Sequence, residues 1–150
     1  MARLALFWLV LTSGFALAAP APKPKVKDED AMQGKWKVVD LQHDGKPADT
    51  DYKDGVATID KDKFSVRGGG DGKARDEVMG YTIDAGKKEI DLTPPQGNAD
   101  ADYRFEGLYK VDRDTLIVDV DTGGGKVRAT ELGPIKEVWY WEFKRVHSEK

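Results

Sequence analysis

The sequence predicts an all-β fold: an eight-stranded antiparallel up-and-down barrel, preceded by a short helical turn. Three observations support this. No segment beyond the N-terminal region holds the period of a long amphipathic helix. Short runs rich in β-branched and aromatic residues recur, and Gly, Pro and Asp separate them. Eight strands with one apolar face each can close into a barrel and so remove exposed sheet edges. A two-sheet sandwich is the alternative architecture.

The first segment, residues 1–18, is expected to be a signal peptide. Arg3 supplies a positive charge, residues 4–11 are apolar, and Ala16-Leu17-Ala18 has the small-x-small pattern of a cleavage site. Spanning a membrane takes about 18 or more apolar residues, so this run is too short to be an anchor. We therefore expect export, to the periplasm or outside the cell, and a mature chain that begins at Ala19 without a membrane span.

A spacer and a single domain follow. Residues 19–27 alternate Pro with Ala and Lys, which is typical of an extended tether. The domain is expected to comprise residues 28–150. Acidic residues at 28–30 are favourable at the positive end of a helical turn.

The eight strands are expected where β-forming runs lie between turn residues. They are residues 35–42, 55–60, 63–67, 78–84, 89–93, 103–111, 115–121 and 137–146. The connections at residues 84–88 and 112–114 are short enough for hairpins, and residues 44–47 are expected to form a four-residue turn. A longer loop with three glycines occupies residues 123–134.

Alternation along the strands assigns the side chains to two faces. The inward face of the last strand is expected to carry Trp139, Trp141, Phe143 and Arg145. The outward face carries Val138 and Tyr140, and we expect Tyr140 to be exposed. Tyr81 and Tyr109 are inward residues of their own strands by the same alternation.

Composition excludes several classes of protein and partner. The chain has no cysteine, which rules out disulfides and a lipid anchor on an N-terminal Cys. The formal charge is −3, and loss of Arg3 with the signal peptide makes it −4. Acidic and basic residues alternate along the chain, so there is no basic stripe for nucleic acid.

Catalytic and metal-binding residues are few, and we expect neither enzymatic activity nor a cofactor. The mature serines, Ser65 and Ser148, do not lie in a Gly-x-Ser-x-Gly turn, and His43 and His147 have no second His or Cys nearby. The aspartates of residues 49–55 depart from a calcium loop because the third comes one position late. A calcium site in the Asp-rich loops is the less favoured alternative.

One stretch carries a family resemblance. Met32-Gln33-Gly34-Lys35-Trp36 resembles the opening of lipocalins, a Gly-x-Trp motif after a short helical turn. More closely, the chain resembles a lipocalin-like domain family of unknown function that is common in planctomycete-type bacteria. Further matching stretches follow in the expected order across the mature domain. They are residues 44–47, 90–93, 107–116, 128–131 and 143–145, of which 107–116 matches most strongly.

The resemblance implies a closed end of the barrel and an open one. In lipocalins the motif Trp lies across the closed end and a basic residue of the last strand covers it. Trp36 and Arg145 match these roles, as a cation over a shielded indole ring. The turn at 112–114 is expected at this closed end. The loops at 44–54, 84–88 and 123–134 are expected at the open rim.

The function expected from the resemblance is non-enzymatic binding of a small, partly apolar ligand inside the barrel. The inward rings best placed to contact it are Tyr81, Tyr109, Trp139 and Trp141, with Trp139 nearest the mouth. The alternative is an envelope-associated structural or protein-interaction domain whose barrel is filled by side chains and holds no ligand.

Overall fold

The structure of the chain is a computed structural model. It describes residues 26–48, 52–68, 76–97, 103–121 and 128–147. The predicted signal peptide and its cleavage site lie outside the described residues, as do most of the tether and the three glycines of the long loop.

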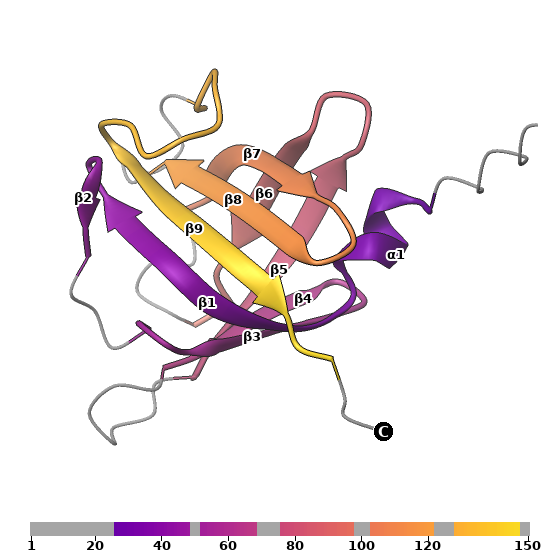
Figure 1. Cartoon of the computed structure of the whole chain (residues 1–150). Helices are drawn as coiled ribbons and strands as arrows, with labels where there is room; N and C mark the ends of the chain where they lie inside the picture. Colours follow the sequence, from indigo (N-terminus) through magenta and orange to yellow (C-terminus); the bar gives the residue numbers. More distant parts are fainter. Residues whose placement is uncertain (1–25, 49–51, 69–75, 98–102, 122–127, 148–150) are drawn as a thin grey trace, which may run out of the picture.

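The described residues form a closed antiparallel barrel with one short helix (Figure 1). The sheet order is β2-β1-β3-β4-β5-β6-β7-β8-β9, and a further pairing of β1 with β9 closes it. This confirms the predicted all-β barrel and excludes the sandwich. The elements are α1 (Asp28–Met32), β1 (Gly34–His43), β2 (Lys46–Pro47), β3 (Val56–Asp60), β4 (Lys63–Arg67), β5 (Asp76–Asp84), β6 (Glu89–Thr93), β7 (Phe105–Val111), β8 (Thr115–Asp121) and β9 (Val138–Arg145).

Strand β2 was not expected. Asp44 and Gly45 have φ angles of 54° and 69°, and positive φ at both central residues suits a two-residue hairpin turn. The turn is therefore shorter than the four residues predicted. It returns the chain so that Lys46 pairs with His43. This places the two-residue strand β2 beside the end of β1.

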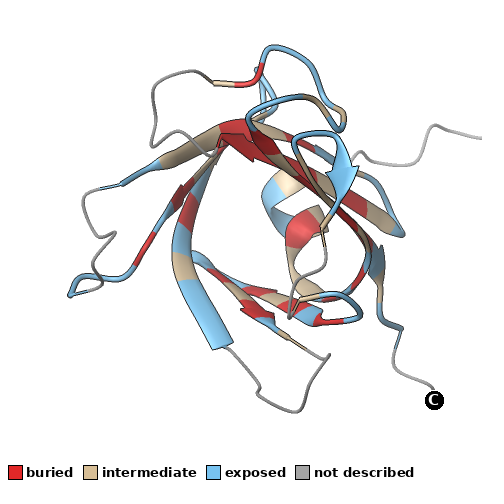
Figure 2. Ribbon diagram, turned by 90° about the vertical axis from the view of Figure 1, so that its left-hand side faces the viewer, coloured by how far each residue is buried: buried red, intermediate tan, exposed pale blue. Residues whose placement is uncertain are grey.

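One end of the barrel is closed by α1 and by the pair predicted from the Gly-x-Trp motif. Trp36 is fully buried, and its Nε1 donates to the carbonyl oxygen of Met32 at 2.8 Å. The guanidinium carbon of Arg145 lies 4.0 Å from the centroid of the Trp36 ring. Arg145 also donates to the carbonyl oxygens of Gln33, at 2.8 Å, and of Ala31. The expected packing of Arg145 on Trp36 is thus observed. Figure 2 views the barrel from its other end, with α1 at the far side.

The hydrophobic core fills this closed half. Its largest fully buried side chains include Trp36, Tyr109, Phe143, Met32, Ile59, Ile90 and Leu116. Most come from inward positions of six different strands, so closure of the barrel and burial of the core depend on the same contacts.

The turn at residues 84–88 lies at the closed end, which corrects the expectation that it joins the open rim. Lys88 of this turn forms an ion pair with Asp28 of α1, and its carbonyl oxygen accepts from the backbone N–H of Tyr109 at 2.9 Å. The physical reason is strand direction. Adjacent strands alternate in direction, and β5 runs toward the end at which β1 begins.

The described part of the long loop covers the outer face of β8 and β9. Asp119 and Tyr140 point outward, yet they are only 0% and 9% exposed. The backbone N–H of Gly133 donates to Asp119 Oδ2 at 2.6 Å, and that of Glu137 donates to Asp44 Oδ1 at 2.7 Å. The expectation that Tyr140 is exposed is therefore wrong, because alternation predicts the face of a strand but not what lies on it.

Candidate ligand-binding site

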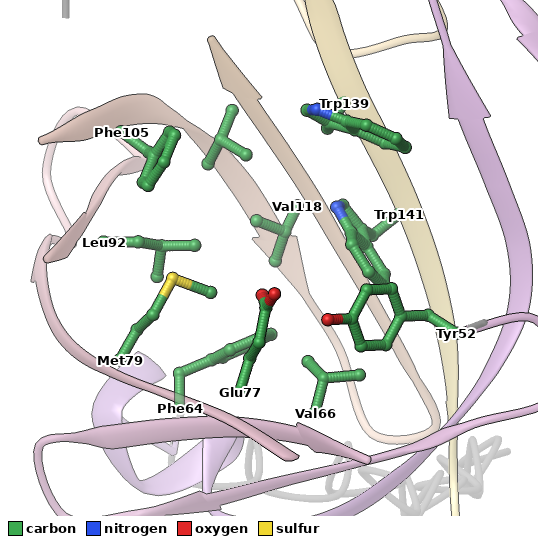
Figure 3. A pocket seen from close by; sticks show the side chains of 11 residues that line it. Tyr52, Phe64, Val66, Glu77, Met79, Leu92, Phe105, Val118, Trp139 and Trp141 are labelled. Atoms are coloured by element: carbon green, nitrogen blue, oxygen red, sulfur yellow. The ribbon is translucent and has the colours of Figure 1, made fainter. Parts of the chain in front are cut away.

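A pocket of about 240 Å³ opens at the end of the barrel opposite α1 (Figure 3). Six strands and the segment before β3 contribute to its walls. The described lining residues are Tyr52, Phe64, Val66, Glu77, Met79, Leu92, Phe105, Val118, Val120, Trp139 and Trp141.

Aromatic rings form one wall of this pocket. Trp139 and Trp141 are successive inward residues of β9, with ring centroids 6.4 Å apart. The Tyr52 ring lies 5.8 Å from that of Trp141, tilted by 56°. Toward the closed end Trp141 stacks on Phe143, at 5.8 Å and 5°, and toward the mouth His43 stacks on Trp139 at 4.4 Å. The rings support one another, so the wall is held in place before any ligand arrives.

The floor and the mouth differ in burial. Phe64, Val66, Leu92 and the two valines of β8 are buried, and they seal the pocket from the core below. The large side chains nearer the mouth are only partly buried: Tyr52, Met79, Phe105, Trp139 and Trp141. A concave apolar surface that stays accessible to water is the usual form of a small-molecule site.

Glu77 is the only charged residue among the described lining residues. It follows the period-two alternation of Met79 and Tyr81 on β5, and its cross-strand partner is Val66, which points inward. Figure 3 shows its carboxylate directed into the pocket, beside the tyrosine and tryptophan rings. Residues 78–84 were the predicted strand, so Glu77 was missed because β5 starts two residues earlier, at Asp76.

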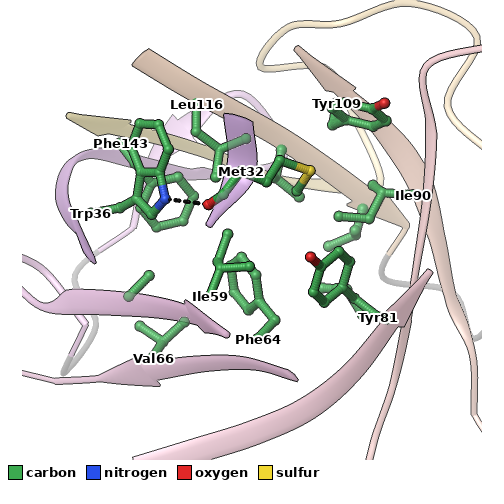
Figure 4. Close-up of a cluster of buried hydrophobic side chains, with 14 of the residues drawn as sticks. Met32, Trp36, Ile59, Phe64, Val66, Tyr81, Ile90, Tyr109, Leu116 and Phe143 are labelled. Carbon is green, nitrogen blue, oxygen red and sulfur yellow. Dashed lines mark hydrogen bonds between the residues drawn. The ribbon is translucent and has the colours of Figure 1, made fainter. Parts of the chain in front are cut away.

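Two of the four residues predicted to contact a ligand line the pocket, and two do not. Trp139 and Trp141 are pocket residues. Tyr81 and Tyr109 lie instead among the core residues under α1 (Figure 4). Alternation assigned all four to the inward face, but distance along the strand decides which end of the barrel each one reaches.

The hydroxyls of Tyr81 and Tyr109 have partners at the closed end. Tyr81 accepts from Gln33 Nε2 at 2.9 Å, and Tyr109 donates to Asp28 Oδ2 at 2.7 Å. Burial raises the pKa of both phenols above the ordinary value, so both stay protonated. Tyr52, by contrast, reaches the pocket from a segment that was expected to be a loop, where no alternation could have identified it.

The two residue types considered for catalysis make separate contacts. Ser65 donates to the carbonyl oxygen of Thr58 at 3.1 Å, and His43 stacks on Trp139. Within the described ranges no three His, Cys, Asp or Glu side chains cluster as metal ligands. No helix in the described part of the chain is long and apolar enough to cross a membrane.

Comparisons with models of protein families, with curated proteins and with solved structures give no match to this chain.

Proposed function

We propose that this chain is an exported, non-enzymatic module that binds a small, partly apolar ligand in the open pocket. One observation carries the proposal. The barrel is filled at its closed half but keeps a pocket at the other end, walled by partly exposed tryptophans. A protein core normally packs such rings against other side chains, so rings left around a concave space favour an occupant.

The size of the pocket limits the ligand. An apolar cavity of about 150 Å³ accepts benzene. At about 240 Å³, the pocket suits a single aromatic ring with a short side chain. The polar end of such a molecule would extend through the mouth, where the walls are accessible to water.

The alternative, an envelope-associated structural or protein-interaction domain, was expected to have a filled barrel. The pocket counts against that alternative in its filled form. An exposed surface elsewhere would have to bind the partner protein, and the exposed apolar residues are scattered over the described chain: Val26, Val39, Val56, Val78, Tyr103, Leu132 and Val146.

Binding is tested by calorimetric titration of the chain from residue 19 onward with 2-phenylethanol, a neutral aromatic probe of suitable size. We expect saturable binding at one site per chain. Trp139→Ala should weaken it roughly tenfold, because the ring forms a wall of the pocket and truncation of a buried aromatic anchor typically costs more than about 1 kcal/mol.

The matched control is Val146→Ala, because Val146 is 44% exposed and follows β9 at the closed end. This variant should bind the probe as the unchanged chain does. If the unchanged chain gives no saturable heat with the probe, and its native mass spectrum after purification from the exported fraction contains no small molecule, the pocket is not a binding site.

A further inference from the structure

The pocket combines three features that select one charge class of ligand. Its wall is aromatic, its mouth is open to water, and its single described charge is the Glu77 carboxylate. We propose, on the basis of the binding function proposed above, that the ligand carries a positively charged nitrogen next to its apolar part, as an aryl-alkyl ammonium does.

The first argument is the unpaired state of Glu77. No lysine or arginine is among the described lining residues, and no ion pair or hydrogen bond to Glu77 is found within the described ranges. The neighbouring carboxylate, Asp76, points outward and pairs with Arg67 at 3.5 Å. Asp76 therefore has a cationic partner within the protein. Glu77 has none among the described residues, so its carboxylate is available to a cation carried by a ligand.

The second argument is the chemistry of the rings around Glu77. The faces of indole and phenol rings are electron-rich, and they attract cations that lie within about 6 Å of the ring centroid. Trp141 and Tyr52 have centroids 5.8 Å apart, and Figure 3 shows both beside the Glu77 side chain. An ammonium group between them and the carboxylate would gain ring contacts and an ion pair together.

The third argument is what the site disfavours. A carboxylate ligand would place a second negative charge next to Glu77, and the described lining offers no basic residue to offset it. A neutral ligand would gain the apolar contacts only. The site therefore discriminates by charge, and the apolar walls fix only the size and shape of the ligand.

The test compares three probes with the same phenyl ring: 2-phenylethylammonium, 2-phenylethanol and 3-phenylpropanoate. Calorimetric titration at pH 7 and low salt should show the ammonium binding about tenfold more tightly than the alcohol, with the carboxylate weakest. Raising the salt concentration should weaken the ammonium alone, because only its binding contains an ionic contact. Glu77→Gln should remove most of the ammonium's advantage and leave the alcohol unchanged.

Asp76→Asn is the matched control. It removes the same charge one residue away but from the outer face, so it should leave the order of the three probes unchanged. Equal binding of ammonium and alcohol, or no effect of Glu77→Gln, overturns the charge inference while the binding function stands. If none of the three probes binds, the failure is that of the binding function. Unchanged thermal unfolding of both variants excludes misfolding as the cause.

Discussion

Asp119 is a carboxylate enclosed on the outside of a barrel. It lies on β8 opposite Tyr140 of β9, and the segment around Gly133 covers it. One of its oxygens accepts from the backbone N–H of Gly133, and the other has no hydrogen-bond partner among the residues that the structure describes. Loss of water around it raises the pKa from 3.8 to about 6, which the single hydrogen bond only partly offsets.

The raised pKa predicts the pH dependence of stability. Between about pH 4 and 6 the folded chain keeps the Asp119 proton and the unfolded chain loses it, so this group lowers stability as pH rises through that window. Above pH 6 the penalty is constant, at about 3 kcal/mol for a shift of about two units. Asp119→Asn carries no charge at any pH. Its stability relative to the unchanged chain should therefore increase from pH 4 to pH 7, as measured by urea unfolding.

Asp112 provides the opposite case. Backbone N–H groups of Asp114 and Thr115 donate to its carboxylate and lower its pKa. Its contribution is present above its ordinary pKa of 3.8 and is lost as the pH falls below that value. Asp112→Asn should therefore be less stable than the unchanged chain at pH 7, and this difference should shrink below about pH 4 rather than between pH 4 and 7. Identical pH profiles for the Asp119 and Asp112 variants would contradict the assignment of Asp119.

Strands β7 and β8 approach unusually closely at Gly107. A Cβ atom there would lie 1.8 Å from the carbonyl oxygen of Asp119 and 3.0 Å from the Cα of Val120. The carbonyl oxygen of Gly107 also accepts from Arg128 Nη1 at 2.8 Å, and Arg128 Nη2 pairs with Asp91 at 2.6 Å. The position therefore connects the β7–β8 pairing to the segment that covers the outer face.

Gly107→Ala should destabilise the chain by about 3 kcal/mol or more, because the atoms that it meets belong to backbone and cannot rotate away. Gly80→Ala on β5 is the control. A Cβ there meets nothing closer than 3.8 Å, so the change should stay within about 1 kcal/mol. Urea unfolding of both variants measures the difference. Equal stabilities would show that β7 and β8 separate at little cost.

The elements were predictable where turn residues lie at both ends of an alternating run. Strands β4, β6 and β8 have the predicted bounds for this reason. The start of β5 was missed because Asp76 and Glu77 are residue types that strands disfavour, and tertiary pairing with β4 decided their conformation. One of these two residues, Glu77, is the charged residue of the pocket, so the missed strand boundary is also why this candidate site residue was missed.

The candidate site was predictable in part. Alternation placed Trp139 and Trp141 inward, and both line the pocket. The assignment of Tyr81 and Tyr109 to the same site required the direction and length of each strand, which set a residue's height in the barrel. Tyr52 and the segment over Tyr140 depend on how loops fold back, and no local pattern in the sequence encodes that contact.

At the scale of the whole molecule, the two ends of the barrel differ in how completely their side chains are packed. The closed end concentrates buried apolar contacts, the α1 cover and the Arg145 hydrogen bonds. The open end leaves apolar rings partly exposed around the pocket, which costs stability that a filled core would have supplied. Stability and the proposed binding function are therefore expected to depend on different tryptophans.

This difference between the two ends predicts that Trp→Ala mainly lowers stability at the closed end and mainly weakens ligand binding at the open end. Trp36→Ala should cost about 3–5 kcal/mol, because it leaves a cavity under α1 and removes both the hydrogen bond to Met32 and the ring beneath Arg145. Trp139→Ala should cost about 1 kcal/mol, since its ring is only partly buried, although it weakens probe binding. Urea unfolding and probe titration on each variant separate the two effects. If Trp36→Ala does not fold, Trp36→Phe keeps a smaller aromatic ring beneath Arg145 but loses the Nε1 donor, and it should give an intermediate loss. Equal stability losses at Trp36 and Trp139 would mean that the open end supports the fold as much as the closed end does, and the aromatic wall would then be core rather than site.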